Sequence, residues 1–356
     1  MWLGPPALLV ASLLVHPYLM AMVAAVLVAA PISLLVRREA LCLPVSIALT
    51  TAIGIAGGLA LLFGYAEEAG VGWGYGYYSM NLLSPIDPAG STLIPFFPVI
   101  MDATGGQYYE GYQYLGAGVL LLCLIAVISI CRRAPIRACA RHSGLLIVSA
   151  GLILFALSNS VFNGPILVFH FEGMPRILQS FRSSGRFFWP VAYLLVIGSI
   201  ATVVRRLPGR ASAAILLIAA ALQFADATAL RNMVRDHLHR TEKWYIDRVA
   251  LGTLMQRSDR LTVWPRYECQ RSVVRDPQYL QVLLLASQYG LRTNTMYTAS
   301  VRSVGPCRAV EVIGTPLPAG ELRIILPAGR IDNVLPPSSP ELCHQISNLT
   351  ACAIRP

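Results

Sequence analysis

The chain has 356 residues, of which 55% are hydrophobic and 13% charged, and its formal net charge is +10 at pH 7. Soluble domains average about 25% charged residues, so this composition excludes a wholly soluble protein and predicts a membrane protein with a smaller soluble part. Many of the positive residues lie in short loops between apolar runs, where they report membrane topology. We therefore expect no nucleic-acid partner.

Six apolar runs are long enough to cross about 30 Å of hydrocarbon, which takes about 20 residues. The first is expected to be one long or kinked span around Pro17, and it lacks the basic start of a signal peptide. The predicted spans are 7–36, 41–64, 114–131, 143–159, 187–204 and 211–228.

Basic loops predict the orientation of these spans. With six spans, the loops after the first, third and fifth all lie on one side, which the positive-inside rule makes cytoplasmic. Their arginines are Arg37, Arg38, Arg132, Arg133, Arg137, Arg141, Arg205, Arg206 and Arg210. The outer face then receives the loops 65–113 and 160–186 and the tail 229–356, with residues 1–228 as the membrane domain.

The tail has the pattern of a small α/β domain. Strands are predicted at 260–265, 293–300, 321–327 and 350–356, and a helix at 276–291 with Asp276 as its N-cap and Pro277 at its first position. Strands that alternate with a helix favour an α/β fold. The fold class predicted is an α-helical polytopic membrane protein with a C-terminal extracytoplasmic α/β domain.

Four cysteines, Cys269, Cys307, Cys343 and Cys352, lie in this tail. An extracytoplasmic domain with four cysteines favours two disulfides, and Cys343 with Cys352 is the easy local pair. Four unrelated thiols are the alternative. No CxxC or Cys/His spacing typical of zinc is present.

The outer loop 65–113 is far longer than a connector needs, and it is rich in Tyr, Trp and Gly. Each of its acids is a candidate general base or ligand of a divalent ion, and each also suits a merely solvated loop. They are Glu67, Glu68, Asp87, Asp102 and Glu110. Glu110 stands out because glycines and tyrosines surround it, and an acid among rings at an interface is costly unless it is paired. No cofactor is identified, and a divalent cation stays open.

The second outer loop ends in "SFRSSGRFFWP" (180–190), which places Arg182 and Arg186 at the start of an apolar run. Guanidinium groups bind phosphate bidentately, and a helix start adds N–H groups to the attraction. The alternative is interfacial anchoring beside Trp189, with the charged heads reaching into water. Since arginines are disfavoured on the outer face, a ligand or a buried acid is expected to hold them.

Two histidines are further candidates. His16 lies inside the first predicted span, where a functional role and hydrogen bonding to the backbone at the Pro17 kink explain it equally well. His170, with Glu172, shares the outer loop of the arginine pair and is a candidate member of one polar cluster.

The segments "MNLLSPIDP" (80–88), "GQYYEGYQYLGAGVLLL" (106–122) and "SFRSSGRFFWP", with the cysteine-bearing tail, resemble an uncharacterised family of bacterial polytopic membrane proteins. Its layout is similar to that of the GT-C glycosyltransferases, which take sugars from polyprenyl-phosphate donors. The resemblance implies that Arg182 and Arg186 hold the donor phosphate, with Glu110 and Asp87 catalytic. Asn81, Tyr112, Tyr114, His16 and His170 are then expected at the substrate.

The same resemblance implies the location and the partners. We expect a multi-pass protein of the bacterial inner membrane, with membrane lipids, a polyprenyl-phosphate sugar and an envelope glycan or lipid acceptor as partners. Members are longer at the N-terminus, so the chain is expected to correspond to the C-terminal part of the pattern. A non-catalytic subunit of envelope polysaccharide assembly or export, and a transporter, are the alternatives.

Overall fold

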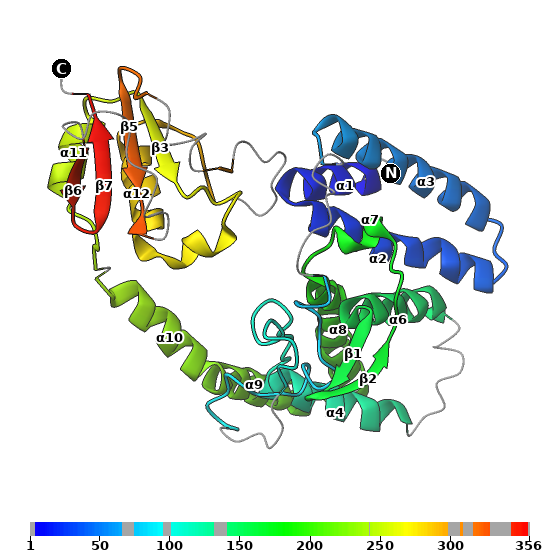
Figure 1. Cartoon of the computed structure of the whole chain (residues 1–356). Coiled ribbons are helices and arrows are strands. Elements are labelled where there is room, and N and C mark those ends of the chain that lie inside the picture. Colours follow the sequence, from blue (N-terminus) through cyan, green and yellow to red (C-terminus); the bar gives the residue numbers. More distant parts are fainter. Residues whose placement is uncertain are drawn as a thin grey trace. The chain divides into compact units, whose positions relative to one another are not determined.

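A computed structural model describes residues 4–65, 75–94, 101–131, 141–241, 243–297, 307–308, 316–327 and 343–354. The chain divides into two compact units, Met1–His239 and Arg240–Pro356 (Figure 1). The sequence pattern placed this boundary at 228/229. Helix α10 (Thr228–His239) belongs to the first unit because only Ala227 separates it from the preceding helix.

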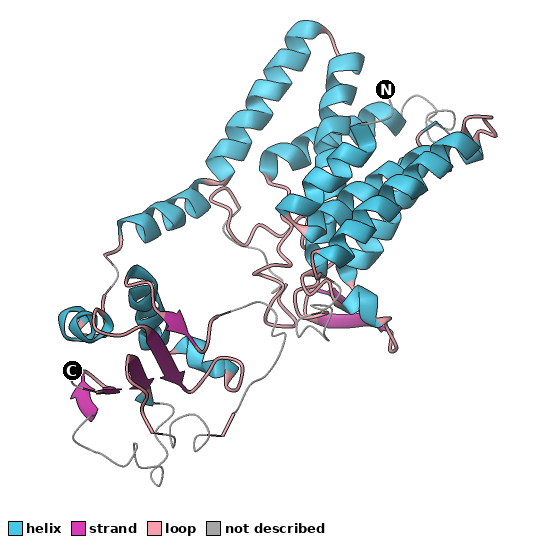
Figure 2. Ribbon diagram, turned by 90° about the horizontal axis from the view of Figure 1, so that it is seen from above, coloured by secondary structure: helices cyan, strands magenta, loops and turns pink. Residues whose placement is uncertain are grey.

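Apolar helices make up most of the first unit (Figure 2). Among the residues described, four helices are long and apolar enough to cross a membrane. They are α2 (Pro17–Val36), α3 (Cys42–Leu62), α8 (Trp189–Arg206) with its preceding 3₁₀ turn η1 (Ser184–Phe188), and α9 (Gly209–Asp226). The apolar helices α1 (Gly4–Val15), α4 (Ala117–Cys131) and α6 (Ser143–Leu157) are shorter than the roughly 20 residues of a full span.

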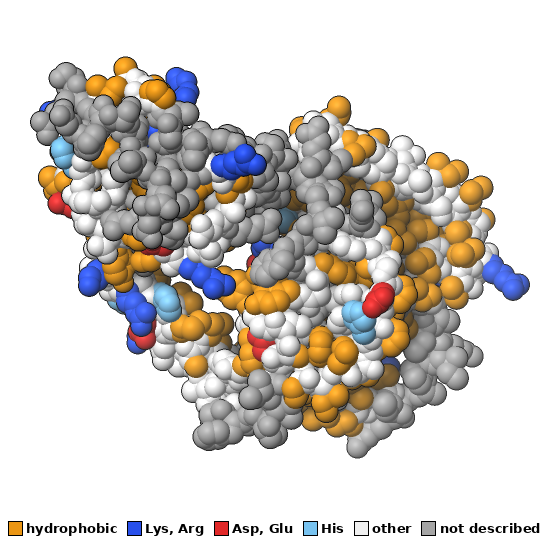
Figure 3. All heavy atoms as spheres, viewed as in Figure 1, with side chains coloured by type: hydrophobic (Ala, Val, Ile, Leu, Met, Phe, Trp, Pro, Cys, Tyr) orange, Lys and Arg blue, Asp and Glu red, His pale blue; other side chains and the backbone are white. Residues whose placement is uncertain are grey.

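Large apolar side chains remain exposed on these helices, as Figure 3 shows. On α3, for example, Leu43, Ile47 and Leu62 are 69%, 59% and 81% exposed. A continuous apolar surface of this kind is unfavourable in water and is matched by lipid hydrocarbon. The first unit therefore has the surface of a membrane protein.

The first predicted span is broken at His16. The structure ends α1 at Val15 and begins α2 at Pro17, whose missing N–H and fixed φ suit the first position of a helix. Helix α1 packs against both α2 and α3, with Leu9 buried near Ala52 and Ala56 of α3. The stretch 7–36 is therefore two helices, of which α2 alone is long enough to span.

Between the helices lie the segments 75–94 and 101–116 and a hairpin. Its strands β1 (Ser160–Asn163) and β2 (Ile166–His170) are antiparallel, and the short helix α7 (Arg176–Gln179) follows. Hydrogen bonds join these two segments to the bundle, as from the N–H of Met80 to the carbonyl of Ala156 (2.8 Å). Glu67 and Glu68, two of the candidate acids, lie outside the described residues.

The second unit is an α/β domain, as predicted. Its sheet has the strand order β4-β3-β5-β7-β6, in which β4, β3 and β5 are parallel and the other neighbours antiparallel. The strands are β3 (Arg260–Trp264), β4 (Arg292–Thr293), β5 (Glu321–Ile325), β6 (Cys343–Ile346) and β7 (Leu349–Ala353). Helices α11 (Arg248–Met255) and α12 (Pro277–Gln288), and the 3₁₀ turn η2 (Arg271–Arg275), complete the unit.

One face of the sheet carries the core of this unit. Leu261, Val263, Leu322 and Ile324 alternate along β3 and β5 and are fully buried in the same cluster as residues of α11 and α12. Asp276 caps α12 as expected, because its side chain accepts a hydrogen bond from the N–H of Gln278. The strand predicted at 293–300 is shorter, and β6 was not predicted.

Two disulfides are formed, as the four cysteines predicted. Cys269 is joined to Cys307, and Cys343 to Cys352. The second pair faces directly across β6 and β7, where the two Cα atoms are 4.0 Å apart. The local pair predicted from the sequence is therefore confirmed.

Candidate functional site

The stretch 180–190 begins the α8 span, and its aromatic residues fix it in the bundle. Phe187 and Phe188 are 5% and 4% exposed and pack in one cluster with Met22 of α2 and Leu152 of α6. The 3₁₀ turn η1 begins at Ser184, so Arg186 lies inside it and Arg182 just before it. Apolar anchoring thus holds both arginines at this end of the span.

Arg182 and Arg186 share one carboxylate, that of Glu110. An Nη2 atom of Arg182 lies 3.3 Å from Oε1 of Glu110, and Nη2 of Arg186 lies 3.3 Å from Oε2. The Glu110 side chain is 13% exposed, whereas those of Arg182 and Arg186 are 33% and 32% exposed. The sequence singled out all three residues, and the structure brings them together.

Two glycines make this meeting possible. A Cβ atom on Gly111 would lie 2.1 Å from the carbonyl oxygen of Ser79, and one on Gly185 would lie 2.8 Å from the Cα of Gly111. The backbones next to Glu110 and Arg186 therefore touch only because both positions lack side chains. The N–H of Gly185 also donates to the carbonyl of Tyr78 (3.1 Å).

Aromatic rings surround the two guanidinium groups. Arg182 lies 5.3 Å from the ring centre of Tyr78, and Arg186 lies 5.9 Å from the rings of both Tyr18 and Trp189. Cation–π contacts at these distances help to hold the arginines in place. The Trp189 contact is the one expected from interfacial anchoring, so anchoring and pairing with an acid both occur here.

The cluster keeps one surplus positive charge, because two guanidinium groups face a single carboxylate. Charges that are only partly hydrated interact more strongly than charges in bulk water. Each arginine side chain is about one-third exposed, and a guanidinium group has five N–H donors, more than the contact with Glu110 uses. The arrangement therefore suits an anion, and above all a phosphate, which accepts several hydrogen bonds at once.

His16 is separated from Arg186 by the ring of Tyr18, which contacts both residues. Its Nδ1 accepts a hydrogen bond from the N–H of Tyr18 (3.2 Å) and caps α2, and the two rings are 5.2 Å apart. The Tyr18 hydroxyl in turn accepts from the N–H of Ser183 (3.0 Å), next to Arg182. The backbone role considered for His16 is thus observed, at the edge of the arginine site.

Asn81 joins the segments 75–94 and 101–116 and is fully buried. Its amide nitrogen donates to the carbonyls of Met101 (2.8 Å) and Gly164 (2.9 Å), and its amide oxygen accepts from the N–H groups of Leu83 and Gly164. These bonds join residues far apart in the chain, including the β1–β2 turn. Asn81 therefore has the geometry of a positioning residue and not of one that contacts a ligand.

Asp87, Tyr112 and Tyr114 lie in a second group. Asp87 is 1% exposed, accepts a hydrogen bond from the Tyr108 hydroxyl (3.0 Å), and receives another from Tyr112 at its carbonyl (3.3 Å). Burial raises the pKa of Asp87, although the hydrogen bond from Tyr108 acts in the opposite direction. Burial also raises the pKa of Tyr112 to about 12, and its ring lies 6.3 Å from that of Tyr114.

The remaining candidates lie elsewhere. His170 is exposed at the end of β2, where its Nδ1 is 2.9 Å from the Ser160 hydroxyl, and Glu172 is exposed. Asp102 accepts hydrogen bonds from four backbone N–H groups of its own loop. Within the described ranges, no group of three or more His, Cys, Asp or Glu side chains is placed to hold a metal ion.

Sequence reasoning noted the glycines around Glu110 but missed the ring contacts of the arginines and the close backbone contact at Gly111 and Gly185. Tyr18 and Tyr78 carried no signal beyond their residue type, because their contacts to the arginines depend on where α2 and the segment 75–94 lie relative to Arg182 and Arg186. Gly111 and Gly185 stood beside Glu110 and Arg186 in the sequence. A small residue next to each charged residue was the one available hint.

One family model, Domain of unknown function (DUF6311), matches residues 1–228. The chain belongs to this family. The DUF6311 region contains every helix from α1 to α9 and all members of the arginine site, and it ends where α10 begins. No curated protein and no solved structure matches the chain. The description of DUF6311 assigns no function, so the function is argued from the site.

Proposed function

We propose that this protein binds a polyprenyl-phosphate sugar at the outer face of the bacterial inner membrane and transfers the sugar to an envelope glycan or lipid acceptor. The observation that carries the proposal is the Arg182–Glu110–Arg186 site, which keeps a surplus positive charge at the end of a candidate span. The phosphate of a lipid-linked sugar lies at the membrane surface, where the end of a span also lies. The GT-C-like layout is an analogy that agrees with this reading.

The topology proposed has six spans, with α4 and α6 crossing as the two shorter ones. Arg205 and Arg206 end α8, and Arg210 follows at the start of α9. The positive-inside rule makes that end of α8 cytoplasmic, which places η1 and the arginine site on the outer face. The two disulfides of the second unit agree with an oxidising compartment on the same side.

In the proposed reaction, the two guanidinium groups hold the donor phosphate from their open side. A base removes the proton from the acceptor hydroxyl, whose oxygen attacks the anomeric carbon while the bond from that carbon to the phosphate oxygen breaks. The polyprenyl phosphate leaves with the electron pair, and the arginines stabilise its growing negative charge. Glu110 is the candidate base because its carboxylate contacts both guanidinium groups that would hold the phosphate.

One observation favours the second candidate function, a non-catalytic subunit of polysaccharide assembly or export. Both oxygens of Glu110 already face arginines, and Asp87 is 1% exposed and bonded to Tyr108. Holding the arginines and removing a proton are different tasks for one carboxylate. A protein that binds the lipid-linked sugar without transferring it needs Glu110 only to hold the arginines.

The test is binding of a polyprenyl-phosphate sugar to the purified full chain in detergent, with wild type beside Arg186→Ala. Loss of the bidentate contact should weaken binding about tenfold or more. Arg210→Ala, at the start of the next helix α9 and so beyond the far end of α8, is the matched control and should bind as wild type does. If Arg186→Ala binds the lipid as tightly as wild type does, the phosphate does not bind at Arg186. If the folded wild-type protein does not bind the lipid at all, the proposed function is wrong.

A further inference from the structure

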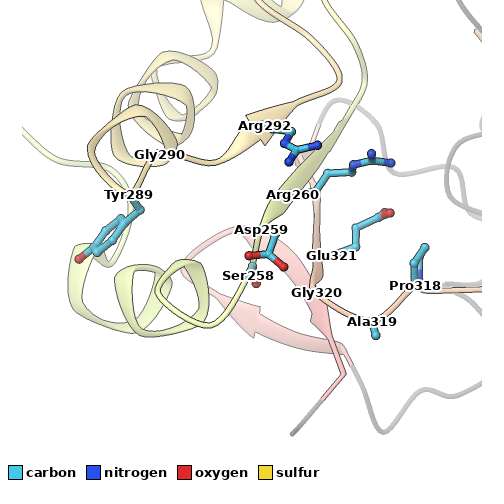
Figure 4. A pocket seen from close by; sticks show the side chains of 10 residues that line it. All are labelled: Ser258, Asp259, Arg260, Tyr289, Gly290, Arg292, Pro318, Ala319, Gly320 and Glu321. Atoms are coloured by element: carbon cyan, nitrogen blue, oxygen red, sulfur yellow. The ribbon is translucent and has the colours of Figure 1, made fainter.

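A pocket of about 740 Å³ opens in the second unit, at the amino ends of its three parallel strands. Its volume lies in the range of small-molecule sites. Figure 4 shows its lining, which comes from the turns before β3, β4 and β5. Tyr289, Pro318 and Ala319 supply its large or apolar side chains, and the rest of the lining is polar or glycine. A lipid tail is a poor fit to such a wall.

Two arginines lie side by side in this pocket. Arg260 begins β3 and Arg292 begins β4, and the two are direct partners in the parallel register, so their side chains leave the same face of the sheet. Both are exposed, and neither guanidinium group has an ion pair or hydrogen bond to any residue that the structure describes. Like charges on neighbouring strands repel, so this pair is unfavourable without an anion.

The acids of the pocket do not cancel this charge. Glu321 is the β5 partner of Arg260, but its Oε1 accepts from Nη2 and Nε of Arg323 at 3.0 and 3.1 Å. Arg323 and Glu321 are 2% and 8% exposed and form a buried pair. Asp259, the remaining acid of the lining, is exposed. Two cations beside one available carboxylate leave the pocket positive.

We propose that this pocket binds the anionic group of a phosphorylated or carboxylated sugar. Arg260 and Arg292 hold the anion between their guanidinium forks, which relieves their mutual repulsion. Asp259 and Ser258, on the same turn, accept hydrogen bonds from the sugar hydroxyls. The site is independent of the DUF6311 region and of the arginine site at Glu110, and it stands if the proposed function fails.

The test is protection of arginines from phenylglyoxal in the full chain in detergent, mapped by mass spectrometry of each peptide. Glucose 1-phosphate, glucuronate and glucose are compared at equal millimolar concentration. An anionic sugar held by both guanidinium groups should slow the labelling of Arg260 and Arg292 about tenfold. Exposed Arg235 of α10 is the internal reference, and Arg182 and Arg186 are read separately, so the two sites succeed or fail independently.

A single variant sharpens the result. In Arg260→Gln, glucose 1-phosphate should protect Arg292 several-fold less than in wild type, because the two arginines share one anion. The control is Arg257→Gln, a change of another exposed arginine in this unit, which should leave the protection of Arg292 unchanged. Protection by one anionic sugar and not the other assigns the anion as phosphate or carboxylate. Equal labelling with and without both anionic sugars, or equal protection by uncharged glucose, overturns the proposal.

Discussion

The two units of this protein each hold a pair of arginines, but they hold them differently. In the first unit, Arg182 and Arg186 share the carboxylate of Glu110, and aromatic rings cover parts of both. In the second unit, Arg260 and Arg292 stand in register on adjacent strands with no carboxylate paired to either among the described residues. Glu110 holds the first pair, whereas no described residue pairs with the second, for which we propose an anionic ligand.

This difference predicts opposite effects on stability. Removing charge from the first site leaves a partner unsatisfied and should destabilise the fold. Removing charge from the second relieves repulsion and should stabilise it in the absence of a ligand. The sign of the change in the free energy of unfolding therefore tells whether an arginine is paired with a carboxylate or repelled by another arginine.

Glu110→Gln should have the largest effect. It leaves two guanidinium groups facing each other without a carboxylate, and the free energy of unfolding should fall by about 2 to 3 kcal/mol, less than for a fully buried pair because water still reaches both groups. Thermal unfolding in detergent measures this. Glu39→Gln, which removes an exposed pair with Arg37, is the control and should cost less than about 1 kcal/mol. Equal losses in the two variants would mean that Glu110 does not hold the arginines.

Gly111→Ala should have the next largest effect. Its Cβ would lie 2.1 Å from the carbonyl oxygen of Ser79, so the backbone must move, at a cost of about 1 to 2 kcal/mol. Because Glu110 precedes this residue, binding at the arginine site should weaken as well.

Gly198→Ala in α8 is the matched control for this change, since no atom lies within 4 Å of its added Cβ. That variant should keep both stability and binding. If Gly111→Ala also keeps both, the close contact of the two loops is not what positions Glu110.

Arg260→Gln should have the smallest effect, and of the opposite sign. Without anions in the buffer, the loss of repulsion from Arg292 should raise the free energy of unfolding by about 0.5 kcal/mol. Glucose 1-phosphate should then stabilise wild type more than the variant, as read from the shift in Tm. A lower Tm for the variant without anions would show that Arg260 already has a stabilising partner.

Much of the first site was open to prediction from the sequence. Glu110 was selected because an acid among tyrosines needs a partner. The arginines were selected because arginines are rare at the end of a span that is expected to face outward. Their ion pairs with Glu110 explain both features. Asn81 was predicted to contact the substrate, whereas the structure shows it bonded to backbone groups of the protein, and this difference could not be predicted. Its partners Met101 and Gly164 are 20 and 83 residues away in the chain.

The pocket of the second unit was not predicted, because the position of its arginines depends on strand register. The strand pattern was placed at 293–300, which left Arg292 outside, whereas β4 is Arg292–Thr293. Only the pairing of Arg292 with Arg260 brings the two charges together. The disulfides were easier, because cysteine count and compartment limit the choices.

The measurement that tests the central claim most directly is crosslinking of the full chain in detergent by a photoreactive polyprenyl phosphate, with the labelled peptides mapped by mass spectrometry. We predict labelling of the peptides that carry Arg182, Arg186 and Glu110, and its loss when unlabelled polyprenyl phosphate competes. Labelling confined to the second unit, or labelling that the competitor does not reduce, would contradict the claim that this site binds a lipid-linked phosphate.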